Sequence, residues 1–189
     1  MAAKKKTIRT IPQQRTPMRE QEPRVRARNF AEVACGYALE DAQREAERCL
    51  LCPEQPCIAG CPVSIDIPGF IQKLGEKDYR GAYDVITATN LLPAVCGRVC
   101  PQENQCEGVC TVGATLEPVA VGRLERWVGD MAIAEGWTNI PYIEPVDFRV
   151  GIVGSGPAGM ACAADMAKAG CDVTVYEAFH QPGGVLRYG

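Results

Sequence analysis

The sequences CLLCPEQPCIAGCP at residues 49–62 and CGRVCPQENQCEGVC at residues 96–110 hold eight of the chain's eleven cysteines. The first run places four cysteines within thirteen positions, and a proline follows the fourth. The second run repeats this Cys-Pro pair at Cys100 and Pro101. Cysteines at such density form disulfides, structural zinc sites or iron–sulfur clusters. The spacing within the two runs helps to choose among these three.

Iron–sulfur clusters fit the spacing best. Disulfides suit small secreted domains, and the polar, Arg-rich first residues contain no apolar signal segment. Structural zinc typically uses two separated cysteine pairs, whereas the first run holds four cysteines together. In ferredoxin-type runs three cysteines bind one cubane, and a fourth, followed by proline, binds the other. Cys49, Cys52, Cys57 and Cys61 follow that arrangement with a longer central spacer.

Two clusters would need ligands from both runs, so the two runs must meet in space. The first three cysteines of the first run would take a fourth ligand from the second run, and Cys61 would join the other cluster. Cys106 and Cys110 are one helical turn apart, which would let both face a cluster from one side. Cys96 is open to two interpretations. It is either an eighth ligand or a buried cysteine that only packs beside the cluster.

The composition is that of an ordinary globular chain. Of its 189 residues, 47% are hydrophobic and 23% are charged. No run approaches the roughly eighteen consecutive apolar residues of a membrane span. Because this use of cysteine needs a reducing compartment, we expect a cytoplasmic protein with no membrane partner. The net charge of −3 gives no indication of nucleic acid as a partner.

Residues 1–28 are basic and contain three prolines, which predicts an extended arm without a helix. Such an arm would dock on an acidic partner or on the rest of a larger polypeptide, or it would be a solvated tail. We prefer the tail for Met1 to Lys6.

Residues 29–136 are expected to form a mostly helical domain that binds two 4Fe-4S clusters. Apolar residues recur there at three- and four-residue steps. The predicted helices run from Leu39 to Cys49, from Ile67 to Leu74, from Tyr79 to Thr87 and from about Val119 to Glu135. Residues 137–148 contain two prolines and no periodic pattern, which predicts a linker.

Residues 149–189 show the start of a Rossmann-like α/β domain. A strand at Arg149–Val153 leads into GSGPAG at 154–159, then an Ala-rich helix ending at Gly170 and a strand at Asp172–Tyr176. Glu177 follows 23 positions after the first glycine. Two strands and one helix cannot bury both faces of a sheet, so we expect this β-α-β unit to be truncated and completed by more chain or by a partner.

This β-α-β pattern predicts a dinucleotide site. Gly156 would let the backbone approach a pyrophosphate, Gly159 would let helix and strand pack closely, and Glu177 would bind a ribose hydroxyl. A glycine turn that binds no nucleotide is the alternative. The predicted cofactor-binding residues are Gly154, Ser155, Gly156, Pro157, Ala158, Gly159, Glu177, Gly183 and Gly184.

Together these motifs resemble the iron–sulfur flavoprotein family typified by the small (beta) subunit of NADPH-dependent glutamate synthase. The family includes the large subunit of ferredoxin:NADP transhydrogenase, sulfide dehydrogenase and the N-terminal part of dihydropyrimidine dehydrogenase. The resemblance covers nearly the whole chain from Arg28 onward, without the family's NAD(P)H-binding domain. It rests on RCLLC at 48–52, Cys57 to Pro62, GRVCP at 97–101, CEGVC at 106–110, GSGPAG at 154–159, Glu177 and PGG at 182–184.

The resemblance implies a ligand set for each cluster. One 4Fe-4S cluster would be held by Cys49, Cys52, Cys57 and Cys110, and the other by Cys61, Cys100, Cys106 and Glu125. In relatives the position of Glu125 holds Glu or Gln. Judged by residue type alone, Glu125 would be an exposed helix carboxylate. The family also treats Cys96 as a non-ligand.

The resemblance further implies an electron-transferring oxidoreductase subunit. It would use two 4Fe-4S clusters, FAD and, in the full-length protein, NAD(P)H, with no catalytic side chain because the cofactors do the chemistry. It would form a hetero-oligomer with a redox subunit, either a glutamate synthase large subunit or a ferredoxin or flavin subunit. The spacing from Cys100 to Cys110 and the IPGF sequence at 67–70 look more like the transhydrogenase and dihydropyrimidine dehydrogenase branches. A non-catalytic iron–sulfur relay that binds no FAD is the alternative.

Overall fold

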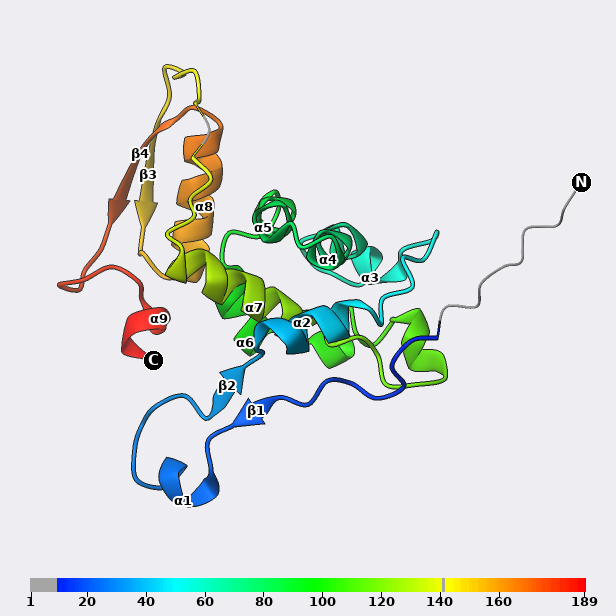
Figure 1. Cartoon of the computed structure of the whole chain (residues 1–189). Helices are drawn as coiled ribbons and strands as arrows, with labels where there is room; N and C mark the ends of the chain where they lie inside the picture. The colour runs from blue at the N-terminus through cyan, green and yellow to red at the C-terminus, as the bar shows by residue number, and fades with distance from the viewer. Residues whose placement is uncertain (1–9, 141) are drawn as a thin grey trace, which may run out of the picture. The chain divides into compact units, whose positions relative to one another are not determined.

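The computed structural model describes residues 10–140 and 142–189 (Figure 1). They form two units, which divide between Thr138 and Asn139. None of the helices in these two ranges is both long and apolar enough to cross a membrane. Met1 to Lys6, where we expected a solvated tail, lie outside the described residues.

The first unit is mostly helical, and its strands β1 and β2 form a short antiparallel pair. Its elements are β1 (Arg19–Glu20), α1 (Pro23–Arg26), β2 (Ala34–Gly36), α2 (Leu39–Ala46), α3 (Pro56–Ala59), α4 (Ile67–Gly75), α5 (Tyr79–Thr87), α6 (Pro93–Val99), the 3-10 turns η1 (Gln102–Asn104) and η2 (Thr111–Ala114), and α7 (Val121–Ala134).

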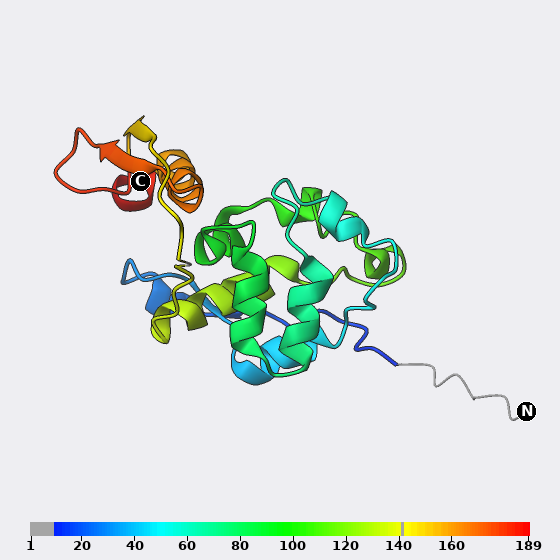
Figure 2. The ribbon, with the colours of Figure 1, turned by 90° about the horizontal axis from the view of Figure 1, so that it is seen from above.

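The helices α4 and α5 lie side by side and confirm two predictions from the apolar spacing (Figure 2). Asp66 caps α4 by accepting a hydrogen bond from the Gly69 N–H at 3.0 Å, and Asp78 caps α5 in the same way through Gly81 at 2.9 Å. Their apolar faces meet α2 and α7 in one core, which includes Phe70, Ile71, Leu74, Ala82, Ile86, Leu124 and Val128.

The helix α6 was not predicted, because it has only seven residues and contains Gly97. It lies against α7 with the two backbones almost in contact. A Cβ atom at Gly97 would lie 2.5 Å from the backbone nitrogen of Arg126, and one at Gly129 would lie 2.4 Å from that of Ala94. These two glycines therefore set the approach that brings the second cysteine run to α7.

Residues 12–16 of the basic arm pack on the first unit. Thr16 is only 2% exposed, and its backbone N–H donates to Glu45 Oε2 at 2.7 Å. The buried Arg48 donates from Nε to the Pro12 carbonyl at 3.0 Å, and Arg15 forms an ion pair with the buried Glu107. Residues 12–16 therefore dock on the rest of the polypeptide and do not form a solvated tail. Pro23, which was expected to prevent a helix, begins the short α1.

The second unit is a β-α-β arrangement with the predicted strand bounds. Strands β3 (Arg149–Val153) and β4 (Asp172–Tyr176) are parallel, in register from Arg149 opposite Asp172 to Val153 opposite Tyr176. Helix α8 (Pro157–Lys168) packs on both strands, and α9 (Val185–Tyr188) follows.

The predicted linker at 137–148 is shorter in the structure. The ring of Trp137 packs against Tyr83 in the first unit, with centroids 5.9 Å apart. The Val146 N–H donates to the Gly170 carbonyl of the second unit at 2.9 Å. Both ends of the predicted linker therefore belong to the folded units.

Candidate functional site

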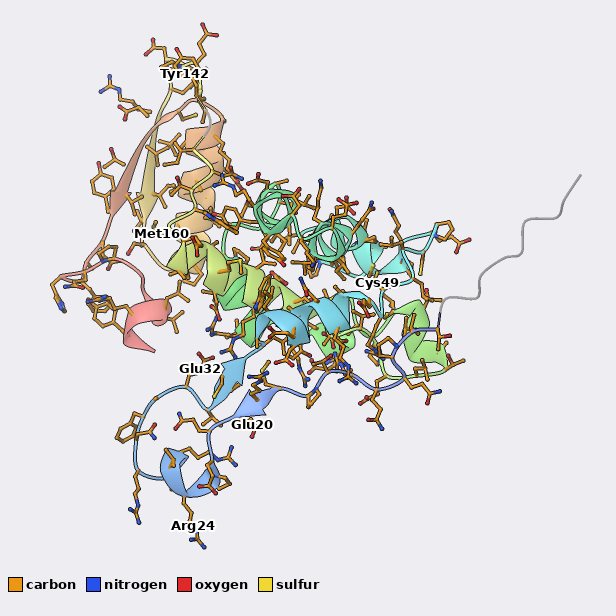
Figure 3. All side chains as sticks on the ribbon, in the orientation of Figure 1. Glu20, Arg24, Glu32, Cys49, Tyr142 and Met160 are labelled. Atoms are coloured by element: carbon orange, nitrogen blue, oxygen red, sulfur yellow. The ribbon has the colours of Figure 1, made fainter. Side chains whose placement is uncertain are left out.

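Four cysteines from the two runs line one cavity: Cys49, Cys52, Cys57 and Cys110. Cys49 follows the end of α2, as Figure 3 shows, and Cys57 lies in α3. Cys110 comes from the second run, directly before η2. The rest of the lining is mostly apolar, with Leu50, Pro56, Ile67, Pro68, Ile71, Val112, Val119 and Val121 beside Thr111. The fold thus gathers thiols that are far apart in the sequence.

The electrostatics of this cavity suit a positively charged inorganic group. Burial, together with the nearby thiols of Cys49 and Cys110, raises the pKa of Cys57 to about 11. Iron provides the charge that lets neighbouring thiolates coexist, and an all-cysteine 4Fe-4S cluster takes four of them. The number, type and grouping of these side chains therefore fit such a cluster.

A second group forms where α6, the loop after it and α7 meet. The pKa of Cys100 is raised by burial and then by the nearby charges of Glu125, Cys96 and Cys61. Burial raises the pKa of Cys106 to about 12, with further contributions from Glu107 and Cys61. These side chains affect one another's pKa because they lie near one another. The group consists of Cys61, Cys100, Cys106 and Glu125, with Cys96 beside them.

Glu125 is not the exposed helix carboxylate that its residue type would suggest. It is 5% exposed, and burial raises its pKa to about 7 against the opposing effect of a hydrogen bond from Asn90. No ion pair joins it to an arginine or lysine within the described ranges. A buried carboxylate without a cation is costly, so this side chain suits a metal ligand. Three thiols and one carboxylate would thus suit a second cluster.

The expectation that Cys106 and Cys110 face one cluster from the same side is wrong. No helix spans residues 105–110, so the four-residue spacing does not place both on one face. Cys110 lines the first cavity, whereas Cys106 lies near Cys61 and Cys100.

Among residues 10–140 and 142–189, no three His, Cys, Asp or Glu side chains converge closely enough to hold a metal ion. In a 4Fe-4S cluster each protein ligand binds a different iron, so the ligands surround the cluster and need not converge on one point.

The three glycines of the turn in the second unit differ in whether the fold itself requires them. Gly154 has a φ of +91°, and a Cβ at Gly159 would lie 2.0 Å from the Gly154 carbonyl oxygen. These two glycines are therefore needed by the turn itself. A Cβ at Gly156 would meet nothing within 4 Å, so protein packing does not require a glycine there. The open space suits close approach of a ligand to the backbone at the start of α8.

Glu177 is held by the glycine turn. Its Oε2 accepts hydrogen bonds from the Ser155 hydroxyl and, at 3.0 Å, from the Ser155 N–H, and its Oε1 accepts from the Phe179 N–H at 2.9 Å. The Ser155 hydroxyl bond and these backbone bonds lower the pKa of Glu177 to about 2. The Gly183 N–H donates to Ser155 Oγ at 3.0 Å, and a Cβ at Gly184 would lie 2.7 Å from Gly156 Cα.

The structure thus gathers the predicted nucleotide residues around the start of α8, where Pro157 and Ala158 begin the helix. The contact of Glu177 with a ribose stays a prediction. In the structure both carboxylate oxygens of Glu177 already accept hydrogen bonds within the chain. Sequence reasoning also missed Asn90, since a lone asparagine between two predicted helices carries no cofactor pattern.

Comparison with known families gives two matches. Residues 26–137 match the family described as dihydropyrimidine dehydrogenase domain II, 4Fe-4S cluster. The chain belongs to this family. Residues 152–188 match a family described as NAD(P)-binding Rossmann-like domain. The 4Fe-4S family covers both cysteine runs and Glu125, and the Rossmann-like match covers the glycine turn and Glu177.

Relatives of known name agree with the resemblance seen in the motifs. The NADPH glutamate synthase small chain of Halomonas elongata is 38% identical over 88% of this chain and 35% of its own length. The NAD-dependent dihydropyrimidine dehydrogenase subunit PreT of Salmonella typhimurium is 38% identical over 84% of this chain and 38% of its own length. The chain thus spans little more than a third of these two relatives. The predicted resemblance to the family typified by the glutamate synthase small subunit is confirmed.

Proposed function

We propose that this chain is the electron-transferring part of an NAD(P)H-dependent oxidoreductase that holds two 4Fe-4S clusters and FAD. The observation that carries the proposal is the cavity lined by Cys49, Cys52, Cys57 and Cys110. This set draws thiols from both runs, and the family resemblance selects the same four residues for one cluster. Residues 29–136 would then form the cluster domain.

The second cluster would take Cys61, Cys100, Cys106 and Glu125. The support is the burial of Glu125 without a cation and its proximity to the thiols of Cys96 and Cys100. Iron would supply the positive charge that this carboxylate lacks. Because thiolate ligands need a reducing compartment, we place the protein in the cytoplasm.

We place FAD at the turn formed by residues 154–159, in the first part of a Rossmann-like domain at 149–189. Gly156 would meet the pyrophosphate, and the N-terminus of α8 would supply positive potential. When bound, FAD exchanges an electron pair with a nicotinamide, and the clusters exchange single electrons with a partner. That partner would be a redox subunit such as a glutamate synthase large subunit or a ferredoxin or flavin subunit.

Iron and acid-labile sulfide analysis of anaerobically purified protein tests the cluster proposal. We expect about eight iron and about eight sulfide per chain, because two 4Fe-4S clusters are filled. Zinc without acid-labile sulfide would refute it. A Cys57→Ser variant should lose about half of the iron, since only one ligand set is altered.

One observation favours the second candidate function, an iron–sulfur relay that binds no flavin. Both oxygens of Glu177 are already used within the chain, by Ser155 and Phe179. Titration of the chain with added FAD separates the two candidates, because only the first predicts that flavin binds at the turn formed by residues 154–159.

A further inference from the structure

Asn90 connects the α5–α6 loop to the second cluster group. Its side chain is 6% exposed. Its Nδ2 donates to Glu125 Oε1 at 2.6 Å, while its Oδ1 accepts from the Leu92 N–H at 3.0 Å and from Cys96 Sγ at 3.5 Å. One carboxamide therefore touches the backbone at the start of α6, the proposed oxygen ligand and the cysteine that is left out of both ligand sets.

The hydrogen bonds fix which way round the Asn90 amide lies. A backbone N–H can only donate, so the atom that faces Leu92 must be the amide oxygen. The amide nitrogen then faces Glu125, where it finds an acceptor. A reversed amide would place two donors together at Leu92 and two acceptors together at Glu125. The structure thus has a fixed donor aimed at one oxygen of Glu125.

The Asn90 hydrogen bond distinguishes the two oxygens of Glu125. Oε1 is engaged by Asn90, whereas no described residue donates a hydrogen bond to Oε2. The carboxylate is buried and has no basic partner in the described ranges. In its ionised form a carboxylate buried in this way is stabilised by a nearby positive group. The arrangement therefore leaves one oxygen of Glu125 available to a metal.

We infer that Asn90 is a positioning residue for the second cluster: it holds Oε1 of Glu125 so that the other oxygen binds iron, and it engages Cys96 outside the ligand set. This inference rests on the proposed function, because it assumes that Glu125 is the oxygen ligand. Asn90 would touch neither iron nor substrate itself. Its effect would pass entirely through the orientation of Glu125.

The test exchanges the direction of the hydrogen bond. Asn90→Asp keeps the size of the side chain and an acceptor for Leu92, but it sets a second carboxylate against Glu125. Adding Glu125→Gln restores a complementary pair, because the Gln amide can donate to the new Asp and keep its own oxygen for iron. Asn104→Asp is the matched control, since Asn104 is exposed and makes no described side-chain hydrogen bond.

Iron content, the electron paramagnetic resonance signals of the reduced protein and the thermal midpoint are measured for each variant. We expect about eight iron per chain in the original protein and in Asn104→Asp, about four in Asn90→Asp, and about eight again in the double variant. The signal of the cluster bound by Cys49 and its partners should persist in all of them.

The outcomes separate the inference from the proposed function. An original protein without two clusters would overturn the proposed function, whatever the variants do. Two clusters in the original protein and unchanged iron and spectra in Asn90→Asp would overturn the inference alone. Equal loss of both clusters with a lowered midpoint, not rescued by Glu125→Gln, would show that Asn90 serves only to hold α6 and would also overturn it.

Discussion

Cys96 and Glu125 lie in the same group, yet their hydrogen bonds suggest opposite roles. A count based on residue type would choose the thiol as a cluster ligand and dismiss the carboxylate. In the structure the Cys96 thiol donates to Asn90, while Glu125 is buried without a basic partner in the described ranges. The surroundings of each side chain therefore favour Glu125 as the ligand and Cys96 as a packing residue.

Single serine substitutions test this assignment. Cys96→Ser should keep about eight iron per chain, whereas Cys100→Ser should keep about four, because only Cys100 belongs to a proposed ligand set. Iron analysis of both variants, prepared in parallel under anaerobic conditions, makes the comparison. If the two variants lose the same amount of iron, Cys96 is a ligand and the assignment of Glu125 fails.

At the scale of elements, the contact between α6 and α7 positions the second cluster group. Helix α6 carries Cys96 and leads directly into Cys100, while α7 carries Glu125. Gly97 and Gly129 allow the backbones to approach so closely that no side chain fits between them. The distance between the thiols and the carboxylate therefore depends on two residues that bind nothing themselves.

Gly97→Ala should destabilise the first unit. The new methyl group would lie 2.5 Å from the Arg126 backbone nitrogen, which cannot move without shifting α7. We expect a loss of about 1–3 kcal/mol in the free energy of unfolding, as is usual for overpacking. Denaturant unfolding measures it. Gly75→Ala in α4 is the control, because its Cβ would meet nothing within 4 Å, and it should be neutral or stabilising by about 0.5–1 kcal/mol. Equal effects at both sites would contradict this view of the contact.

The sequence predicted the elements whose signal is local. Helices α4 and α5 follow from apolar spacing, and β3, α8 and β4 follow from the glycine turn between two apolar strands. The short α6 was missed because its stability comes from contact with α7, which no local pattern reveals. Spacing alone also did not predict that Cys106 and Cys110 lie apart, because the segment that joins them is an irregular loop without a fixed periodicity.

At the scale of the whole chain, polar contacts over long sequence distances hold the first unit together. The buried Arg48 pairs with Glu45 at 2.8 Å and also donates to the carbonyls of Pro12 and Pro118. Glu45 in turn accepts from the backbone of Thr16 and Ala120. Composition predicted the basic arm but not the burial of Arg48. That burial depends on distant partners such as Pro118, which is 70 residues away in the sequence.

The second unit exposes much of its apolar surface, with Val153 at 91% and Tyr176 at 61% exposure. Most of a bound cofactor's surface is normally buried, so a single β-α-β unit supplies only part of a flavin site. We therefore expect FAD to bind the 189-residue chain weakly and to be lost on gel filtration. Its affinity is then best measured by fluorescence titration, with NADPH as the competing nucleotide.

Gly156→Val tests whether this weak binding occurs at the glycine turn. The Cβ atom of the new side chain would meet no protein atom within 4 Å, so we expect the fold to tolerate the change, while the side chain would occupy the space proposed for the pyrophosphate. A steric cost of about 1–3 kcal/mol corresponds to FAD binding that is weaker by roughly 5-fold to 150-fold. The iron content is the internal control, because the proposed clusters lie in the first unit. Unchanged FAD affinity in Gly156→Val would remove flavin from this turn, and tighter binding of NADPH than of FAD by the original chain would assign the turn to the nicotinamide cofactor.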